Sequence, residues 1–332
     1  HIVKREPMVW YKNVLVRAAA IIASLLVSAV VITLLTGKNP FQVYGSMISG
    51  AFGSSLRIWS LVQNTAILLC ISLAVTPAFK MKFWNCGAEG QVLISGLATT
   101  AVMMFLGDSL PYPLLIVVML LTSVLAGIVW AVIPAFFKAM WNTNETLFTL
   151  MMNYVAIQFV AFFLKYFVTS GSGVLAPMPE HGLPVLLGQS YLLNIIIVAV
   201  LTVLVYIYLK KTKHGYEISV VGESENTAKY IGINVRKVVI RTLVVSGALC
   251  GIAGLLLVGG TNHTISTTTV DGRGFTAIMV SWLGKFNPIY MVLTSFLIVF
   301  LQRGAGQVST DFRLPSAISD IVTGIILFFI IG

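Results

Sequence analysis

Charged side chains are scarce in this sequence. Asp, Glu, Lys and Arg together make up 10% of the 332 residues, whereas hydrophobic residues make up 58%. Because a soluble domain carries roughly 25% charged residues, this composition provides too little charge to cover a surface exposed to water. The sequence therefore excludes an ordinary soluble enzyme and indicates that lipid surrounds most of the chain.

Cysteine is rare as well, and it follows no pattern. The three cysteines, Cys70, Cys86 and Cys250, lie in or beside apolar segments, and no two of them have the spacing of metal ligands. Their odd number does not suit a disulfide framework. We therefore expect no structural disulfide and no metal bound by this chain.

Catalytic motifs are missing too. Gly37-Lys38 is followed by Asn39, and no earlier glycine completes the phosphate-binding pattern Gly-x-x-x-x-Gly-Lys-[Ser/Thr]. His181 and His263 fall in predicted loops without a His-Glu-x-x-His motif, which disfavours an intramembrane hydrolase. We expect the chain to be no enzyme, with no catalytic residue and no ATP site of its own.

Long hydrophobic runs are abundant, and about 20 apolar residues suffice to cross a bilayer core of roughly 30 Å. Seven runs are clear, and they cover residues 14–35, 60–79, 87–106, 111–137, 146–168, 190–209 and 240–260. Three follow: a short one at 274–284, which stops before Pro288, then 288–302 and 316–331. The sequence predicts an all-α integral membrane protein with about ten membrane segments in one transmembrane domain, 1–332.

The eighth segment, 274–284, is too short to span and is expected to be a half-helix. Interrupted segments are tolerated at membrane depth only where protein or a water-filled cavity covers their free backbone groups. This segment is therefore a candidate cavity wall.

Basic residues assign an orientation. If the N-terminus is cytoplasmic, most of the 21 Lys and Arg residues fall in cytoplasmic loops, as the positive-inside rule requires. Ten segments return the C-terminus to the same side. The net charge of +10 then follows from topology, and no nucleic-acid partner is needed to explain it.

The longest predicted cytoplasmic connection covers about 210–241. Glu223-Ser224-Glu225-Asn226 suits the start of a short helix, which Thr227 to Ile231 would form. Gly232 would end it in a left-handed C-cap. Such a helix is shaped to dock in a groove of another protein, although a solvated connecting loop explains the same residues.

Polar residues mark the start of the third run. Asn85 suits an N-cap, and Glu89, with Gln91 close behind, would lie in the first turn near the positive end of the helix. Glu89 either anchors the cytoplasmic end of this helix or pairs with a basic residue across a moving interface, since intramembrane carboxylates are costly without a partner. We expect Asn85, Glu89 and Gln91 to have structural or gating roles.

Further candidates lie deeper in the runs. Gly247 and Gly251 have the Gly-x-x-x-Gly spacing that lets helices approach closely, which suits either ordinary packing or a moving contact. Amides, hydroxyls and aromatic rings suit a substrate pathway, although they also bridge helices or face lipid. The candidate pathway residues are Asn64, Thr65, Asn153, Tyr154, Gln158, Ser281 and Trp282.

Four stretches resemble permease subunits of ABC importers for sugars and nucleosides. Gly222 to Asn234 resembles the cytoplasmic loop of that family, and Ser246 to Gly254 its next helix. Asn85-Cys86-Gly87-Ala88-Glu89-Gly90-Gln91 is closer to the nucleoside branch, which usually has Ile where this chain has Cys86. The fourth stretch is Asn144-Glu145-Thr146 leading to Met152-Asn153-Tyr154, and the Leu147-Phe148 pair between them departs from the pattern. The resemblance covers roughly 40–330 in family order.

This resemblance implies a multi-pass permease of a bacterial cytoplasmic (inner) membrane. A separate ATPase subunit, carrying ATP and Mg, would dock on a coupling helix and drive alternating access. The resemblance also implies a second permease chain, which would form a heterodimer with this one. It further implies an extracellular substrate-binding lipoprotein. Residues expected to couple to the ATPase are Gly222, Glu223, Asn226, Ala228, Tyr230 and Gly232. Nucleosides are the expected substrate, and ribose or another simple sugar is the alternative. A secondary transporter is disfavoured because Asp320 and Glu89 fall near predicted helix ends.

Overall fold

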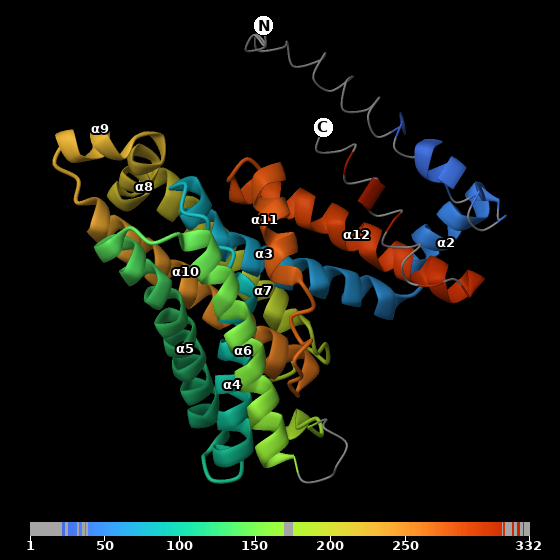
Figure 1. Ribbon diagram of the computed structural model, residues 1–332. Coiled ribbons are helices and arrows are strands. Elements are labelled where there is room, and N and C mark those ends of the chain that lie inside the picture. The colour runs from blue at the N-terminus through green and yellow to red at the C-terminus, as the bar shows by residue number, and fades with distance from the viewer. Residues whose placement is uncertain are drawn as a thin grey trace, which may run out of the picture. The chain divides into compact units, whose positions relative to one another are not determined.

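The computed structural model describes residues 39–168 and 175–313, with scattered positions between 22 and 37 and between 315 and 328. The described residues form helices and loops, and within these ranges there is no β-strand (Figure 1). They fall into two compact units, which we describe separately. A terminal unit contains residues up to Leu61 and from Phe296 onward, and a central unit contains Val62–Ser295.

Seven described helices are long and apolar enough to cross a membrane. They are α3 (Ser55–Lys80), α4 (Ala88–Leu106), α5 (Tyr112–Trp141), α6 (Glu145–Phe167), α7 (Leu192–Lys211), α10 (Val235–Leu257, continued by the π-helix η2, Val258–Asn262) and α12 (Pro288–Phe312). They confirm the predicted runs from 60–79 to 240–260 and the run at 288–302. The predicted runs at 14–35 and 316–331, and both termini, lie largely outside the described residues.

The short eighth segment is a helix of its own, α11 (Arg273–Leu283). Its length of about 16 Å is roughly half the thickness of a bilayer core. It is followed by Gly284 and a left-handed turn at Lys285 and Phe286, and α12 begins at Pro288. The predicted half-helix is therefore present.

The cytoplasmic connection predicted at 210–241 contains two helices. The expected one is α9 (Glu225–Tyr230), where the Ser224 hydroxyl accepts a hydrogen bond from the Thr227 N–H and Gly232 has a φ of +81°. It is preceded by α8 (Lys213–Glu223), capped by Thr212, which the sequence analysis treated as loop. The terminal unit contains a further helix that was not predicted, α2 (Pro40–Phe52), which Asn39 caps.

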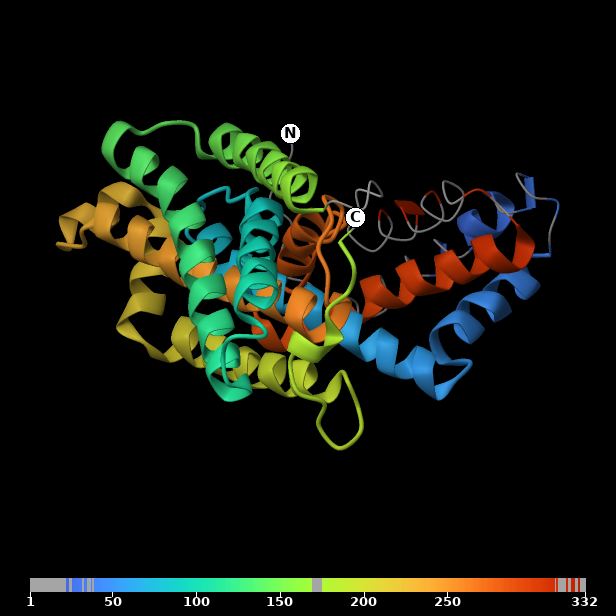
Figure 2. The same cartoon turned by 90° about the horizontal axis from the view of Figure 1, so that it is seen from below.

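Small residues bring α4, α5 and α10 into close contact in the central unit, and α5 and α10 lie side by side in both views (Figure 1, Figure 2). A Cβ added to Gly247 would lie 2.5 Å from the Gly127 carbonyl oxygen, and one added to Gly251 would lie 2.6 Å from the Val124 Cα. Gly254 meets Ser95 of α4 in the same way. The predicted close approach at Gly247 and Gly251 is confirmed, and its partner is α5.

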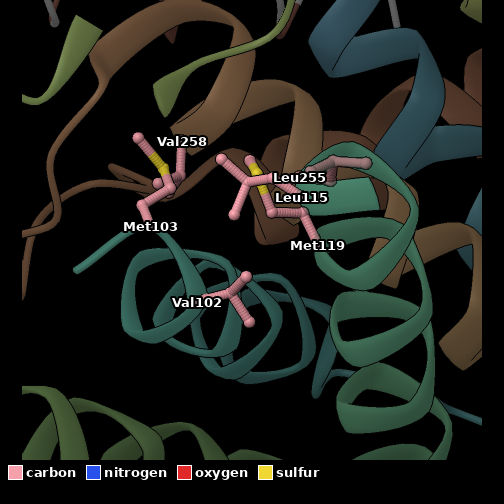
Figure 3. Packing of buried hydrophobic residues seen from close by; sticks show 6 residues of the cluster. All are labelled: Val102, Met103, Leu115, Met119, Leu255 and Val258. Carbon is pink, nitrogen blue, oxygen red and sulfur yellow. The ribbon is translucent and has the colours of Figure 1, made fainter. Parts of the chain in front are cut away.

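Beside this glycine contact the same three helices share an apolar cluster (Figure 3). Its buried members are Val102 and Met103 of α4, Leu115 and Met119 of α5, and Leu255 and Val258 of α10 and η2. The cluster and the glycines together make α4, α5 and α10 the packed centre of this unit.

Gly251→Ala should destabilise the protein because its methyl group would strike the backbone of α5. Overpacking of this kind costs about 1–3 kcal/mol, so the variant should unfold at a lower temperature in detergent than Gly306→Ala. Gly306 is a matched control, since a Cβ there meets nothing within 4 Å. Equal thermal midpoints for the two variants would contradict the close helix contact.

Candidate functional site

The half-helix α11 begins against Glu89 of α4. The Gly272 N–H donates to one carboxylate oxygen of Glu89 at 2.9 Å, and the Gly274 N–H donates to the other at 2.7 Å. Gly272 is the N-cap residue of α11, and it has no side chain to supply this cap. Glu89 therefore satisfies two of the backbone donors that a helix start leaves unpaired, and its charge lies at the positive end of α11.

Two glycines make this contact possible. A Cβ added to Gly274 would lie 2.4 Å from the Glu89 backbone nitrogen, so any larger residue would force α11 away from α4. Gly272 has a φ of +70°, a conformation that glycine adopts without strain. The glycines on both sides of Arg273 are thus required by the geometry of the site.

The other side of α11 lies along α3. The Arg273 guanidinium donates to the Asn64 carboxamide oxygen at 3.0 Å, and the Ser281 hydroxyl is 2.8 Å from that of Thr76. The rise along α3 from Asn64 to Thr76 is about 18 Å. The N-terminal end of α11, and Glu89 with it, therefore lies well away from the Lys80 end of α3.

Glu89 lies where the sequence predicts, in the first turn of α4. However, its hydrogen-bond partners are backbone groups of α11, which neither interpretation of the sequence contained. It caps a helix from a distant part of the chain.

A cluster of amides joins the start of α4 to its neighbours. The Asn85 oxygen accepts from the Gly87 N–H and the Gln91 amide, both at 3.2 Å, and the Asn85 amide donates to Ser246 of α10 at 3.3 Å. The prediction that Asn85 is the N-cap of this helix is wrong, because Gly87 holds that position. Asn85 instead cross-links the turn before α4 to α10.

Asn153 of α6 has a similar bridging position. Its oxygen accepts from the Gly90 N–H at 2.8 Å, and its amide donates to the Cys86 carbonyl at 2.9 Å. The side chain is buried. Both ends of this amide thus hold α6 against α4, a bridging role that the sequence also allows for an amide in a membrane helix.

The remaining pathway candidates form two groups. Along α3 and α11, Asn64 meets Arg273, Thr65 is buried, and Ser281 is buried against Thr76. On α6, Tyr154 is 71% exposed, and Gln158 joins Val155, Phe159 and Phe162 in a groove of about 420 Å³. The structure does not unite these two groups in one described site.

An aromatic group stands at the C-terminal end of α11. The Trp282 ring lies 5.9 Å from that of Trp84 and 5.6 Å from that of Phe286, measured between centroids. Trp282 and Trp84 are about half exposed. Trp84 and Arg273 were not among the predicted site residues, although a charged residue between two glycines at 272–274 was a signal for Arg273.

The α8–α9 segment combines an exposed surface with firm anchors. Glu223, Asn226 and Tyr230 are exposed, whereas Ala228 is fully buried. A Cβ added to Gly222 would lie 2.2 Å from the Lys80 carbonyl oxygen, so α8 packs directly against the end of α3.

A salt bridge ties α8 to α10. The Arg241 guanidinium donates to the Glu217 carboxylate at 2.6 Å. This hydrogen bond, together with the positive charge of Arg241, holds the pKa of Glu217 below its usual value. A displacement of α8 would therefore reach both α3 and α10.

The helices and their discontinuous segment define a multi-pass membrane protein. The chain belongs to the permease family described as the branched-chain amino acid transport system permease component, which matches residues 57–331. No solved structure matches the chain.

Three curated relatives are similar over nearly the whole chain. The guanosine ABC transporter permease NupP of Bacillus subtilis is 28% identical over 96% of this chain and 93% of its own length. The nucleoside ABC transporter permease NupB of Lactococcus lactis is 28% identical over 96% of this chain and 91% of its own. The glucose ABC transporter permease TsgB13 of Haloferax volcanii is 26% identical over 94% of this chain and 85% of its own length.

The salt bridge between Glu217 and Arg241 makes a prediction about pH. Because the pKa of Glu217 is lowered in the folded protein, the stability from the pair is complete above the ordinary glutamate pKa of about 4.3. It is lost as the pH falls through the lower folded value. Glu217→Gln should speed hydrogen exchange of the α8 amides at neutral pH. The corresponding loss in opening free energy should be less than about 1 kcal/mol, because the pair is partly exposed. In the variant, exchange of these amides should no longer show the additional acceleration at acid pH that loss of the salt bridge causes in the wild type.

Glu223→Gln is the matched control, since Glu223 lies on the same helix and is exposed. The α8 amides of Glu223→Gln should exchange at the wild-type rate. If those of Glu217→Gln also exchanged at the wild-type rate, the salt bridge would not hold α8.

Proposed function

We propose that this chain is the permease subunit of an ATP-driven importer that moves nucleosides across a bacterial cytoplasmic membrane. Family membership supports the permease role, and two full-length relatives named for nucleoside or guanosine transport support the substrate class. The relative named for glucose transport keeps ribose or another simple sugar as the alternative.

The observation that carries the substrate proposal is the aromatic pair at α11. Trp84 and Trp282 are adjacent and each is about half exposed, and a nucleobase stacks on aromatic rings of this kind. A simple sugar has hydroxyls but no extended flat face. Asn64 and Arg273 lie at the other end of α11, about one helix length of 16 Å away, so they supply hydrogen-bonding groups for a base edge or a ribose at a separate position along the same pathway.

The second group of pathway candidates is the exposed stripe on α6. Gln158 stands there among large aromatic side chains. An amide facing lipid lacks hydrogen-bond partners, so in this proposal a second permease chain or the substrate pathway covers Tyr154 and Gln158.

The proposed mechanism is alternating access driven by a partner ATPase, which carries the ATP and Mg. The partner docks on the exposed residues of α9, with Glu223, Asn226 and Tyr230 at the contact. When the ATPase closes on ATP, it displaces α8. The contacts of Gly222 with α3 and of Glu217 with α10 pass this displacement to the membrane helices. An extracellular lipoprotein delivers substrate. Ten membrane segments, of which α11 is a half-helix, keep both termini in the cytoplasm.

Uptake of a radiolabelled purine nucleoside by the reconstituted importer tests this proposal. Excess unlabelled nucleosides should compete, whereas excess ribose should not. Trp282→Ala should reduce uptake several-fold, since loss of a stacking contact costs about 1 kcal/mol.

The matched control is Trp141→Ala, because Trp141 is an exposed ring at the end of α5 that contacts Phe136 edge-on and Phe137 at a tilt. Its uptake should equal that of the wild type. Full competition by ribose and none by nucleosides would replace the nucleoside proposal with the sugar alternative.

A further inference from the structure

We propose that Arg273 is a specificity-determining residue of the substrate pathway and that Glu89 is the residue that positions it. This inference rests on the proposed transport function and extends it to two residues of one contact. Arg273 is held from both sides, since its guanidinium binds Asn64 and its flanking backbone N–H groups bind Glu89.

The chemistry of the contact requires a carboxylate. Gly272 and Gly274 present two donors, and the two oxygens of Glu89 accept one bond each. A glutamine has one acceptor oxygen, and its NH₂ group would face the second N–H. Two donors that face one another repel, so the start of α11 is expected to shift away from the amide.

The geometry transmits this movement to Arg273. At its C-terminal end α11 is fixed to α3, where Ser281 bonds to Thr76 and to the Ser72 carbonyl. A short rigid helix that is released at its N-terminal end and held at its C-terminal end moves most at its first residue, Arg273. Loss of Glu89 therefore separates the guanidinium from Asn64 while Trp282 stays near Trp84.

Arg273 suits direct recognition of the proposed substrate. A guanidinium is a planar fork of donors that meets paired acceptors on a base edge or ribose. Asn64, its partner across the contact, carries both a donor and an acceptor. The pair can thus bind a polar group of the substrate at the N-terminal end of α11, at a position along the pathway separate from the tryptophans at its other end.

Kinetics of the reconstituted importer separate positioning from folding. Arg273→Lys keeps the charge but loses the fork, so the KM for nucleoside uptake should rise about tenfold with little change in kcat. Glu89→Gln should raise KM to a similar extent. The double variant should resemble either single variant, because both changes remove the same contact.

Two glycine variants give an independent route to the same displacement. Gly274→Ala leaves the charge of Glu89 intact but pushes α11 away from α4, and it should raise KM as Glu89→Gln does. Gly306→Ala, placed in open space, should match the wild type.

A labelling measurement on the purified permease needs no substrate. The labelled protein carries Phe275→Cys, at an exposed position of α11, together with Cys86→Ser. When Glu89→Gln or Gly274→Ala is added to this protein, the new cysteine should react with a thiol reagent about fivefold faster. Unchanged labelling and unchanged KM in folded protein would overturn the positioning role. An unchanged KM in Arg273→Lys would overturn the specificity role.

The proposed function can fail separately. If the wild type takes up ribose and not nucleosides, the substrate assignment is wrong, and the KM comparison made with ribose still decides the role of Arg273. The labelling result decides the role of Glu89 in either case.

Discussion

The interaction on which the central unit depends is the cap that Glu89 provides for α11. The start of a helix leaves backbone N–H groups without an intrahelical partner. The carboxylate of Glu89 accepts from two of them, and its own charge is compensated by the positive end of the helix. Without this cap the first turn of α11 would lose its contact with α4, and Arg273 would lose its defined place, while the C-terminal end of α11 would stay bound to α3 through Ser281.

The rest of the unit is arranged so that this cap can form. Glycines let α10 pack on α5 and α4 without intervening side chains, and the Asn85 and Asn153 amides fix the start of α4. This start carries Glu89, so the cap is placed by helices α6 and α10 as well. At the other end, α8 rests on α3 and binds α10. A movement of the exposed α9 therefore has a direct mechanical path to the helices that hold the site.

Local patterns predicted local structure well. The apolar runs located the described spans because lipid imposes a length and a composition on every spanning helix. Ser224 and Gly232 located α9 because a cap and a left-handed stop act within a few residues. The amphipathic α8 carries fewer such signals, and it was missed.

Local sequence patterns did not predict the contacts between distant parts of the chain. Glu89 and Gly274 are separated by six described α-helices, and nothing in the residues around Glu89 indicates that its partner is a backbone amide. Asn153 could be recognised as a polar membrane residue, but only the fold shows that its amide joins α6 to Cys86 and Gly90. The pairing of Arg273 with Asn64 depends in the same way on how α11 lies along α3.

The central claim is that α9 faces the cytoplasmic ATPase while the loop before α7 faces outward. It is tested most directly by labelling single cysteines in intact cells with an impermeant thiol reagent. Lys229 and Ser190 are exposed, so Lys229→Cys and Ser190→Cys report on the two sides. The account predicts that Ser190→Cys reacts in intact cells and that Lys229→Cys reacts only after the membrane is opened. Reaction of Lys229→Cys in intact cells would contradict it.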